Sequence, residues 1–507
     1  MLEVLSGLPD ALSVASIFAM CIGTAAGILV GAIPGLTATL AMALLLPFTY
    51  TMAPLTSLGM MAGIYNGSMY GGAIPAILLK IPGTPSAVAT TFDGPPLVRQ
   101  GRGKFALHVA LVASAAGSVL SAIALMLLAP PLVSFALRFG PVEYFWVAIF
   151  GMTAVSLLMV SAPAKGVSAA LLGIAVGIVG QDMMTGSERL VFGLREVAGG
   201  INIAVLLTGL FAVPPALAML AGGSSHGTGG ISLSGRGIRL WEAIRLWPTI
   251  LRSGAIGIIV GIMPGAGGNL AGILSYSEEK RSAKNSDQFG KGEPRGIAAS
   301  ECGNNADNAS SLIPTLALGV PGNSVAALMM GAMLIQGLNP GPALFTQHPD
   351  VVFGFMWQML ITGVVMLGMG FVGAALFIQM LRIPTALLSP MILVICSIGT
   401  YAAGNSFVDV WLMLGFGVAA YFLSRSGYPI APIVLGAILG PLAESSFRRA
   451  LLITRGEPAA FFSSTISLIL VAAILLVIGM PLIRYGIGRF KNRPSAALHE
   501  GHTHDND

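Results

Sequence analysis

A short run near the middle of the chain concentrates amide and carboxylate groups in an otherwise apolar sequence. Asn304, Asn305, Asp307 and Asn308 place four such side chains in five positions. Amide and carboxylate oxygens, together with backbone carbonyls freed by irregular backbone, suit a hard cation such as Na⁺. Small polar residues also allow close helix packing, but packing alone does not require four of them here. We therefore interpret this run as a cation-binding site.

A second polar segment lies in the first half of the chain. It reads Gly63-Ile-Tyr-Asn-Gly-Ser-Met-Tyr-Gly-Gly72, and an offset of 239 (305 − 66) places Asn66 on Asn305 and Ser68 on Asp307. We add Asn66 and Ser68 to the predicted cation-binding residues. For the glycines of this segment we prefer the alternative interpretation, in which they let two helices pack closely.

Two short loops present hydroxyl and amide groups next to the start of an apolar helix. They are Pro82-Gly-Thr-Pro-Ser86 and Pro321-Gly-Asn-Ser324. Two hairpin tips that meet near the membrane midplane would form one substrate site, and N–H groups at helix starts suit a carboxylate. Each loop could also be an ordinary turn with a helix cap. The predicted substrate-binding residues are Thr84, Pro85, Ser86, Lys80, Asn323 and Ser324.

Three ionisable residues lie in or beside these segments. Lys80 is the only charged residue between Tyr50 and Asp93, and an ionisable residue within a membrane is a functional candidate. Its ammonium group could attract an anionic substrate, or it could reach the interface beside the basic residues that follow. Asp93 and Glu301 are candidate coupling carboxylates, but either could cap a helix.

The elements that position these groups are predicted to be membrane helices. Of the 507 residues, 55% are hydrophobic and only 9% are charged, whereas soluble domains carry about 25% charged residues. Apolar runs such as 105–137 and 461–483 exceed the roughly 20 residues that span a bilayer. We therefore predict an all-α polytopic protein of the lipid bilayer. The net charge of +5 indicates basic cytoplasmic loops, not nucleic-acid binding.

The sequence indicates neither catalysis nor a bound cofactor. Cys21, Cys302 and Cys396 are scattered, so no disulfide or metal framework follows from them. We find no nucleotide-binding loop and no credible catalytic triad. We predict that the protein is not an enzyme and that its only inorganic ligand is a coupling ion, Na⁺ or H⁺.

Two short sequence motifs each occur twice in the chain. Gly27–Gly35 returns as Gly257–Gly265 with 6 of 9 positions identical, and Ile74–Gly83 returns as Ile313–Gly322 with 5 of 10 identical. Pro-Gly breaks at matching places inside apolar segments are typical of a secondary transporter built from two repeats. The predicted hinge residues are Pro34, Gly35, Pro82, Gly83, Pro264, Gly265, Pro321 and Gly322.

The distribution of charge predicts how the repeats lie in the membrane. Lys and Arg residues follow the Pro-Gly core of the first repeat but precede that of the second. Because basic loops remain in the cytoplasm, the repeats should be inverted relative to each other, with broken helices and re-entrant hairpins. The predicted parts are a first membrane repeat at 1–221, a cytoplasmic linker at 222–247, a second repeat at 248–484, and a disordered cytoplasmic tail at 485–507.

These motifs resemble the large membrane subunit of the tripartite tricarboxylate transporter family. The similarity covers nearly the whole chain, roughly residues 11–485, and the paired long motifs make it specific. It is carried by Gly31-Ala-Ile-Pro-Gly-Leu-Thr37, Tyr65–Gly72, Ile81–Ser86 with Phe92–Gly94, and Asn304–Asn308 with Pro321–Ser324.

The resemblance implies a permease of the bacterial inner membrane. Such a permease takes up an organic carboxylate by using an ion gradient, commonly of Na⁺, and works with a small integral membrane subunit and a periplasmic solute-binding protein. Lys80 departs from the family pattern, in which a neutral polar residue such as Asn is expected, so the substrate stays open. The alternatives are a stand-alone carboxylate carrier and a passive channel; an intramembrane enzyme is disfavoured because no nucleophile–base pair is present.

Overall fold

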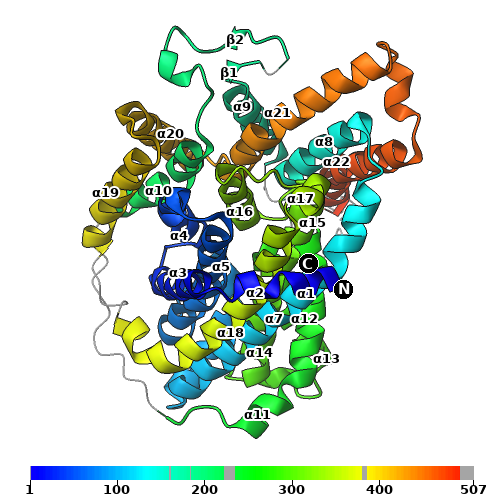
Figure 1. The fold of residues 1–507 in the computed structure, drawn as a ribbon. Helices are drawn as coiled ribbons and strands as arrows, with labels where there is room; N and C mark the ends of the chain where they lie inside the picture. Colours follow the sequence, from blue (N-terminus) through cyan, green and yellow to red (C-terminus); the bar gives the residue numbers. More distant parts are fainter. Residues whose placement is uncertain are drawn as a thin grey trace, which may run out of the picture.

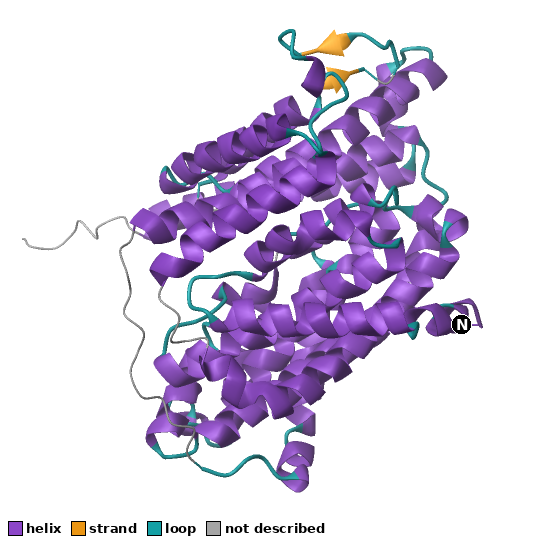
Figure 2. Ribbon diagram, turned by 60° about the vertical axis from the view of Figure 1, so that its left-hand side comes forward, coloured by secondary structure: helices purple, strands orange, loops and turns teal. Residues whose placement is uncertain are grey.

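Helices make up almost all of the computed structural model (Figures 1 and 2), which describes residues 2–158, 162–182, 184–221, 235–265, 267–379 and 385–491. Seven of the described helices contain a stretch long and apolar enough to cross a membrane. They are α3 (Val14–Ala32), α7 (Gly103–Ala136), α10 (Ile203–Ala221), α18 (Pro349–Gln379), α19 (Thr385–Gly404), α20 (Phe407–Arg425) and α21 (Ile430–Ile453). The prediction of an all-α polytopic membrane protein is confirmed.

The other described elements are not among these seven spans. The longer ones are α5 (Pro54–Leu79), α6 (Thr90–Arg99), α8 (Pro141–Leu158), α9 (Pro163–Gly177), α12 (Trp247–Ile262), α13 (Gly267–Ser282), α14 (Pro294–Ser310), α16 (Ser324–Ile335) and α22 (Thr465–Lys491). The short helices are α1 (Leu2–Ser6), α2 (Leu8–Ala11), α4 (Ala38–Leu45), α11 (Leu240–Arg245), α15 (Leu312–Leu318) and α17 (Pro342–Gln347), with 3-10 turns η1 (Leu46–Thr51), η2 (Pro85–Ala87), η3 (Arg195–Val197), η4 (Ser286–Gln288) and η6 (Pro458–Phe462). Two short strands, β1 (Gly180–Gln181) and β2 (Glu188–Arg189), form an antiparallel pair.

Two buried helices, α5 and α14, carry the polar segments. Every residue of α5 from Ser57 to Ile77 is buried, as is every residue of α14 from Gly296 to Ser310. Both are regular helices across their polar segments, so the expected release of backbone carbonyls there is not found. In each case a glycine-containing helix lies alongside: α3 packs on α5, and α12 packs on α14.

Glycines set the close approach of these helix pairs. A Cβ atom added to Gly27 of α3 would lie 2.5 Å from the carbonyl oxygen of Ile64, and one added to Gly257 of α12 would lie 2.3 Å from that of Gly303. The residues are related by the sequence offsets 257 − 27 = 230 and 303 − 64 = 239. The same local packing therefore occurs in both halves, while their opposite orientation in the membrane stays a prediction.

The loops after α5 and α15 also match each other. The Gly83 N–H donates to the Gly72 carbonyl over 3.1 Å, and the Gly322 N–H donates to the Ser311 carbonyl over 3.3 Å. Each pair is related by the offset of 239 (322 − 83 and 311 − 72). These bonds fold the two Pro-Gly loops back onto the helices that precede them.

All four predicted hinge pairs lie just beyond the end of a helix. Pro34-Gly35 and Pro264-Gly265 follow α3 and α12, and the Pro-Gly pairs at 82–83 and 321–322 follow α5 and α15. Gly265 donates its N–H to the carbonyl of Gly322 over 2.8 Å, so two of these turns touch each other. Hinge motion at these positions stays a prediction.

Two of the predicted segments extend outside the described residues. Residues 222–234 of the linker and 492–507 of the tail lie outside the described residues. The rest of the linker contains α11, and α22 continues to Lys491, past the predicted tail boundary at 485.

Lys80 ends α5 in a conformation that favours glycine. Its φ is 62°, in the left-handed region, and Gly319, at the same place in the repeat (80 + 239), ends α15 with a φ of 72°. Side chains other than Gly and Asn rarely adopt this conformation, so the Asn that the family pattern would place at this position suits it better than Lys80 does.

Replacing Lys80 by Gly should stabilise the protein. The left-handed conformation costs a non-glycine residue about 1–2 kcal/mol, and part of this gain is offset because glycine makes the unfolded chain more flexible. We expect a net gain of roughly 0.5–1 kcal/mol, seen as a higher unfolding midpoint in detergent. Lys80→Ala removes the charge but keeps the strain, so an equal gain in both variants would contradict this explanation.

Candidate functional site

The polar run of α14 contains three residues with buried oxygens that lack a partner. Asn304, Asp307 and Asn308 are all fully buried, and their spacing of three and four places them on one helix face. Among the described residues, nothing hydrogen-bonds to the Oδ1 atom of any of the three. Because buried polar atoms are nearly always hydrogen-bonded, one carboxylate and two amide oxygens within a single turn suit a bound cation.

Asn66, by contrast, uses its whole side chain to join helices. Its Nδ2 donates to the Met359 carbonyl (3.2 Å) and to Thr362 Oγ1 (2.9 Å). Its Oδ1 accepts from Ser118 Oγ (3.2 Å) and from Asn308 Nδ2 (2.8 Å). An amide has two donors and two acceptor positions, so Asn66 retains none for an ion and instead ties α5 to α7, α14 and α18.

Ser68 and Asn305 also make hydrogen bonds within their own helices. Ser68 Oγ donates to the Tyr65 carbonyl over 3.0 Å, and Asn305 Nδ2 donates to the Glu301 carbonyl over 2.9 Å. Of the six residues predicted to bind a cation, Asn304, Asp307 and Asn308 therefore present free oxygens, whereas the other three serve helix contacts.

Asn323 connects the second hairpin tip to the α14 cluster. Its Oδ1 accepts the Ala326 N–H over 2.8 Å and so caps α16. Its Nδ2 donates to Asp307 Oδ2 (2.7 Å) and to the Tyr65 hydroxyl (2.9 Å). The tip therefore contacts both the cation cluster and a helix of the other half. Ser324 begins α16 directly after this cap.

The first hairpin tip rests on α5 near the second. Thr84 Oγ1 and Ser86 Oγ lie 3.0 Å apart, and Ser86 Oγ donates to Met69 Sδ over 3.5 Å. Met69 lies four residues after Tyr65, so the two tips contact one face of α5 about one turn, roughly 5.4 Å, apart. A substrate site shared by the two tips stays a prediction.

The other two residues predicted at the substrate site are exposed. Pro85 begins η2 and Lys80 ends α5, and neither is buried. No ion pair joins Lys80 to any residue in the described part of the chain. The structure therefore places Thr84, Ser86 and Asn323 at the tips and Lys80 on the surface.

Sequence reasoning missed Tyr65. Its hydroxyl accepts from Asn323 and lies 3.3 Å from Ser311 Oγ, so it joins α5 to the second tip and to the residue between α14 and α15. The offset of 239 places Tyr65 on Asn304, and that correspondence is the signal that could have identified it.

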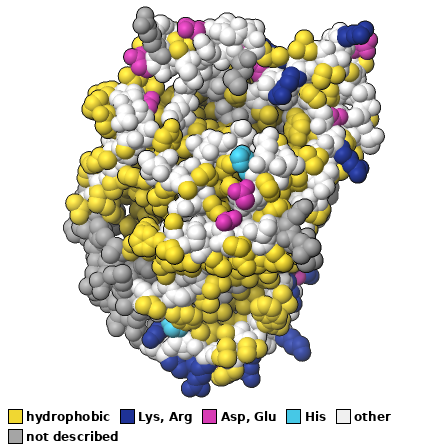
Figure 3. All heavy atoms as spheres, in the orientation of Figure 1, with side chains coloured by type: hydrophobic (Ala, Val, Ile, Leu, Met, Phe, Trp, Pro, Cys, Tyr) yellow, Lys and Arg dark blue, Asp and Glu magenta, His cyan; other side chains and the backbone are white. Residues whose placement is uncertain are grey.

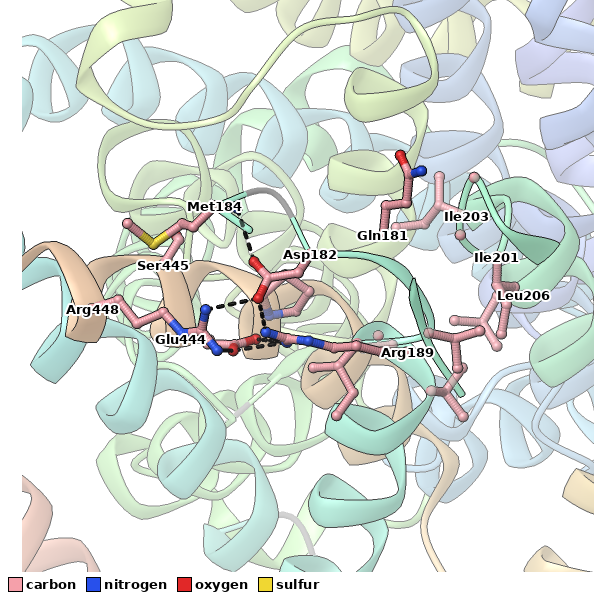
Figure 4. A pocket seen from close by; sticks show the side chains of 18 residues that line it. Gln181, Asp182, Met184, Arg189, Ile201, Ile203, Leu206, Glu444, Ser445 and Arg448 are labelled. Atoms are coloured by element: carbon pink, nitrogen blue, oxygen red, sulfur yellow. Dashed lines mark hydrogen bonds and ion pairs between the residues drawn. The ribbon is translucent and has the colours of Figure 1, made fainter. Parts of the chain in front are cut away.

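A separate pocket of about 310 Å³ lies beside the strand pair at the opposite end of the molecule from α11 (Figures 1 and 4). Its charged residues pair with one another: Arg189 Nη1 binds Glu444 over 2.8 Å, and Arg189 and Arg448 both bind Asp182. The Met184 N–H and these guanidinium groups hold the pKa of Asp182 well below its usual range. Because its charges are neutralised internally, we interpret this cluster as the anchor of the strand pair.

Comparison with known proteins identifies the family. A family model described as the tripartite tricarboxylate transporter TctA family matches residues 17–435. The chain belongs to this family. The TctA family is a transporter family. This TctA chain is therefore a multi-pass membrane subunit of a transport system with further subunits, and that part of the prediction is confirmed.

Two curated relatives come from Agrobacterium vitis. The chain is 36% identical over 481 residues to an uncharacterized 52.8 kDa protein in the TAR-I ttuC' 3' region, covering 94% of both chains. It is 39% identical over 224 residues to an uncharacterized protein in the TAR-II ttuC' 3' region, covering 44% of this TctA chain and 90% of the relative. No solved structure matches the chain.

Proposed function

We propose that this TctA chain is the permease of a binding-protein-dependent system that takes up an organic carboxylate across the bacterial inner membrane, driven by Na⁺. The observation that carries the proposal is the set of unpartnered buried oxygens at Asn304, Asp307 and Asn308, beside the hairpin-tip residue Asn323. The family indicates the class of substrate. The unpartnered oxygens favour a cation as the coupling ion.

The donor atoms favour Na⁺ as that ion. Three of the four unpartnered side-chain atoms of Asn304, Asp307 and Asn308 are oxygens, which are the ligands of hard cations, and the fourth is Asn304 Nδ2. One carboxylate among neutral amides provides a single negative charge, which one monovalent ion balances. Burial strengthens this attraction because the local dielectric is low.

The hairpin tips are the proposed carboxylate site. Thr84 and Ser86 provide hydroxyls, and the N-terminus of the 12-residue helix α16 follows Asn323. The start of a helix attracts anions through its free N–H groups and its dipole. A cation held at Asp307 would add positive charge next to Asn323, so binding of the ion should favour binding of the substrate.

The charge distribution supports one orientation in the membrane. Exposed basic residues gather at the end that carries α11 and the end of α13, which is the bottom of Figures 1 and 3, and the strand pair lies at the opposite end. Figure 3 shows a further group of Lys and Arg side chains at the upper right. By the positive-inside rule the basic end is cytoplasmic. The two halves are then inverted repeats, and the strand pair faces the periplasm, where a solute-binding protein would deliver the substrate.

Uptake of citrate, a tricarboxylate, into proteoliposomes tests the proposal. The chain should be reconstituted together with the small membrane subunit and the periplasmic binding protein. With an inward Na⁺ gradient, luminal citrate should rise above the external concentration, and an equal K⁺ gradient should not support this. Equilibration without accumulation would indicate a passive channel, and accumulation by this chain alone would favour the stand-alone carrier.

A further inference from the structure

We propose that Glu301 is a proton-binding site, distinct from the cation site at Asp307, and that its proton is exchanged during the transport cycle. The carried-proton part of this inference rests on the proposed transport function, whereas the existence of the proton site does not. The site has three parts: a buried carboxylate, hydroxyl donors from the other half of the chain, and a hairpin that connects them.

Hydroxyl groups enclose the Glu301 carboxylate. The side chain is fully buried. Thr90 Oγ1 donates to its Oε1 and Ser114 Oγ donates to its Oε2 over 3.2 Å. Thr90 Oγ1 also lies 3.0 Å from Ser300 Oγ. No ion pair reaches Glu301 from any residue the structure describes.

The two buried carboxylates of α14, Asp307 and Glu301, therefore differ in their hydrogen bonding. Asp307 and its neighbours have oxygens without partners, as ligands awaiting a cation would. At Glu301 both carboxylate oxygens and the surrounding hydroxyls have hydrogen-bond partners, so this site lacks the unpartnered oxygens that mark the cation site. A buried carboxylate without a counter-ion is very costly in its charged form. A proton on Oε1 removes that charge: the new O–H can donate to Thr90 Oγ1, whose own hydrogen then turns to Ser300 Oγ, 3.0 Å away.

Ionisable groups on the neighbouring elements do not provide the missing counter-charge. Tyr70 of the neighbouring helix α5 is a phenol and carries no positive charge in either protonation state. Asp93 of α6 accepts the Tyr276 hydroxyl and three backbone N–H groups. His108 of α7 packs against Phe371. Arg252 of α12 pairs with Glu279 of α13, and Arg281 of α13 pairs with Glu278. Arg99 of α6, Lys104 of α7 and Lys280 of α13 form no ion pair with Glu301.

The position of Thr90 connects the Glu301 site to the hairpin. Thr90 begins α6, three residues after η2, which is the first hairpin tip. Thr90 and Ser114 belong to the first half of the chain, and Glu301 to the second. A movement of the halves against each other would separate the hydroxyls from the carboxylate and admit water. The O–H bond of the protonated carboxyl would then break, the proton would pass to water, and the ionised form would be solvated.

Infrared difference spectroscopy of the purified full-length chain tests the proton site directly. A protonated carboxyl group has a C=O stretching band that an ionised carboxylate lacks. We expect such a band, lost on titration to high pH, in the unmodified protein and in Asp307→Asn, and its absence in Glu301→Gln. Thr90→Val removes one hydrogen bond to this group and should move the band to a higher frequency. A band that survives Glu301→Gln unchanged would overturn the site.

The carried proton is tested in proteoliposomes loaded with a pH-sensitive dye. Adding external citrate and Na⁺ should acidify the lumen with the unmodified chain, and Glu301→Gln should reduce the acidification per citrate at least tenfold. Equal acidification by both proteins would overturn the carried proton. If the unmodified system takes up no citrate, the proposed function fails, and the infrared band alone then decides whether Glu301 binds a proton.

Discussion

Asp307→Asn should raise the Na⁺ concentration that half-saturates citrate uptake by roughly 140- to 3,700-fold. The substitution nearly preserves shape but removes the only charge of the proposed cation site. Loss of one partner from a buried ion pair costs about 3–5 kcal/mol, and about 1.4 kcal/mol corresponds to a factor of ten. Initial uptake rates measured over a wide range of Na⁺ at constant ionic strength would show the shift, or a complete loss of Na⁺ dependence.

Asp409→Asn provides the matched control. Asp409 lies in the first turn of α20, within one of the apolar spans and apart from the α14 cluster. The same change of a carboxylate to an amide there should leave the Na⁺ response unchanged. If Asp307→Asn also leaves it unchanged, the ion is bound elsewhere, whatever happens to the maximal rate.

The repeats were the most reliable information in the sequence. The offsets 230 and 239 predicted which residues correspond, and the close contacts of Gly27 and Gly257 recur at those offsets. Where two helix backbones pack closely, only glycine fits at the point of contact. The same glycine therefore occurs at the corresponding position of each half. The left-handed end of α5 at Lys80 follows the same logic, because its counterpart is Gly319.

The division of the polar residues could not be predicted from the repeats. Asn66 and Asn305 correspond in sequence, but the direction of each side chain depends on helices distant in the chain. Asn66 donates hydrogen bonds to residues 359 and 362 of α18, about 295 positions away. The sequence around Asn66 does not indicate that this distant helix is its neighbour. For the same reason Glu301 could be named as a candidate carboxylate, while its hydroxyl partners Thr90 and Ser114 could not.

The two hairpin tips should respond differently to mutation. Asn323→Ala removes a donor to Asp307 and the cap of α16, so it should raise the half-saturating concentrations of both Na⁺ and citrate. Thr84→Ala removes only a hydroxyl that pairs with Ser86, so it should raise the value for citrate alone. Loss of one hydrogen bond to a charged group costs roughly 1.5–3 kcal/mol, a weakening of about 10- to 150-fold.

Uptake kinetics in which Na⁺ and citrate are varied independently would separate these effects, with protein amount in the liposomes measured for each variant. Thr346→Ala, an exposed hydroxyl whose bond stays within α17, is the control for threonine loss. If the half-saturating citrate concentration is near normal in both Thr84→Ala and Asn323→Ala, these loops cap helices and do not bind the substrate. A rise in both concentrations for Thr84→Ala would instead mean that the first tip also supports the cation site, because Ser86 and Asn323 contact the same face of α5 through Met69 and Tyr65.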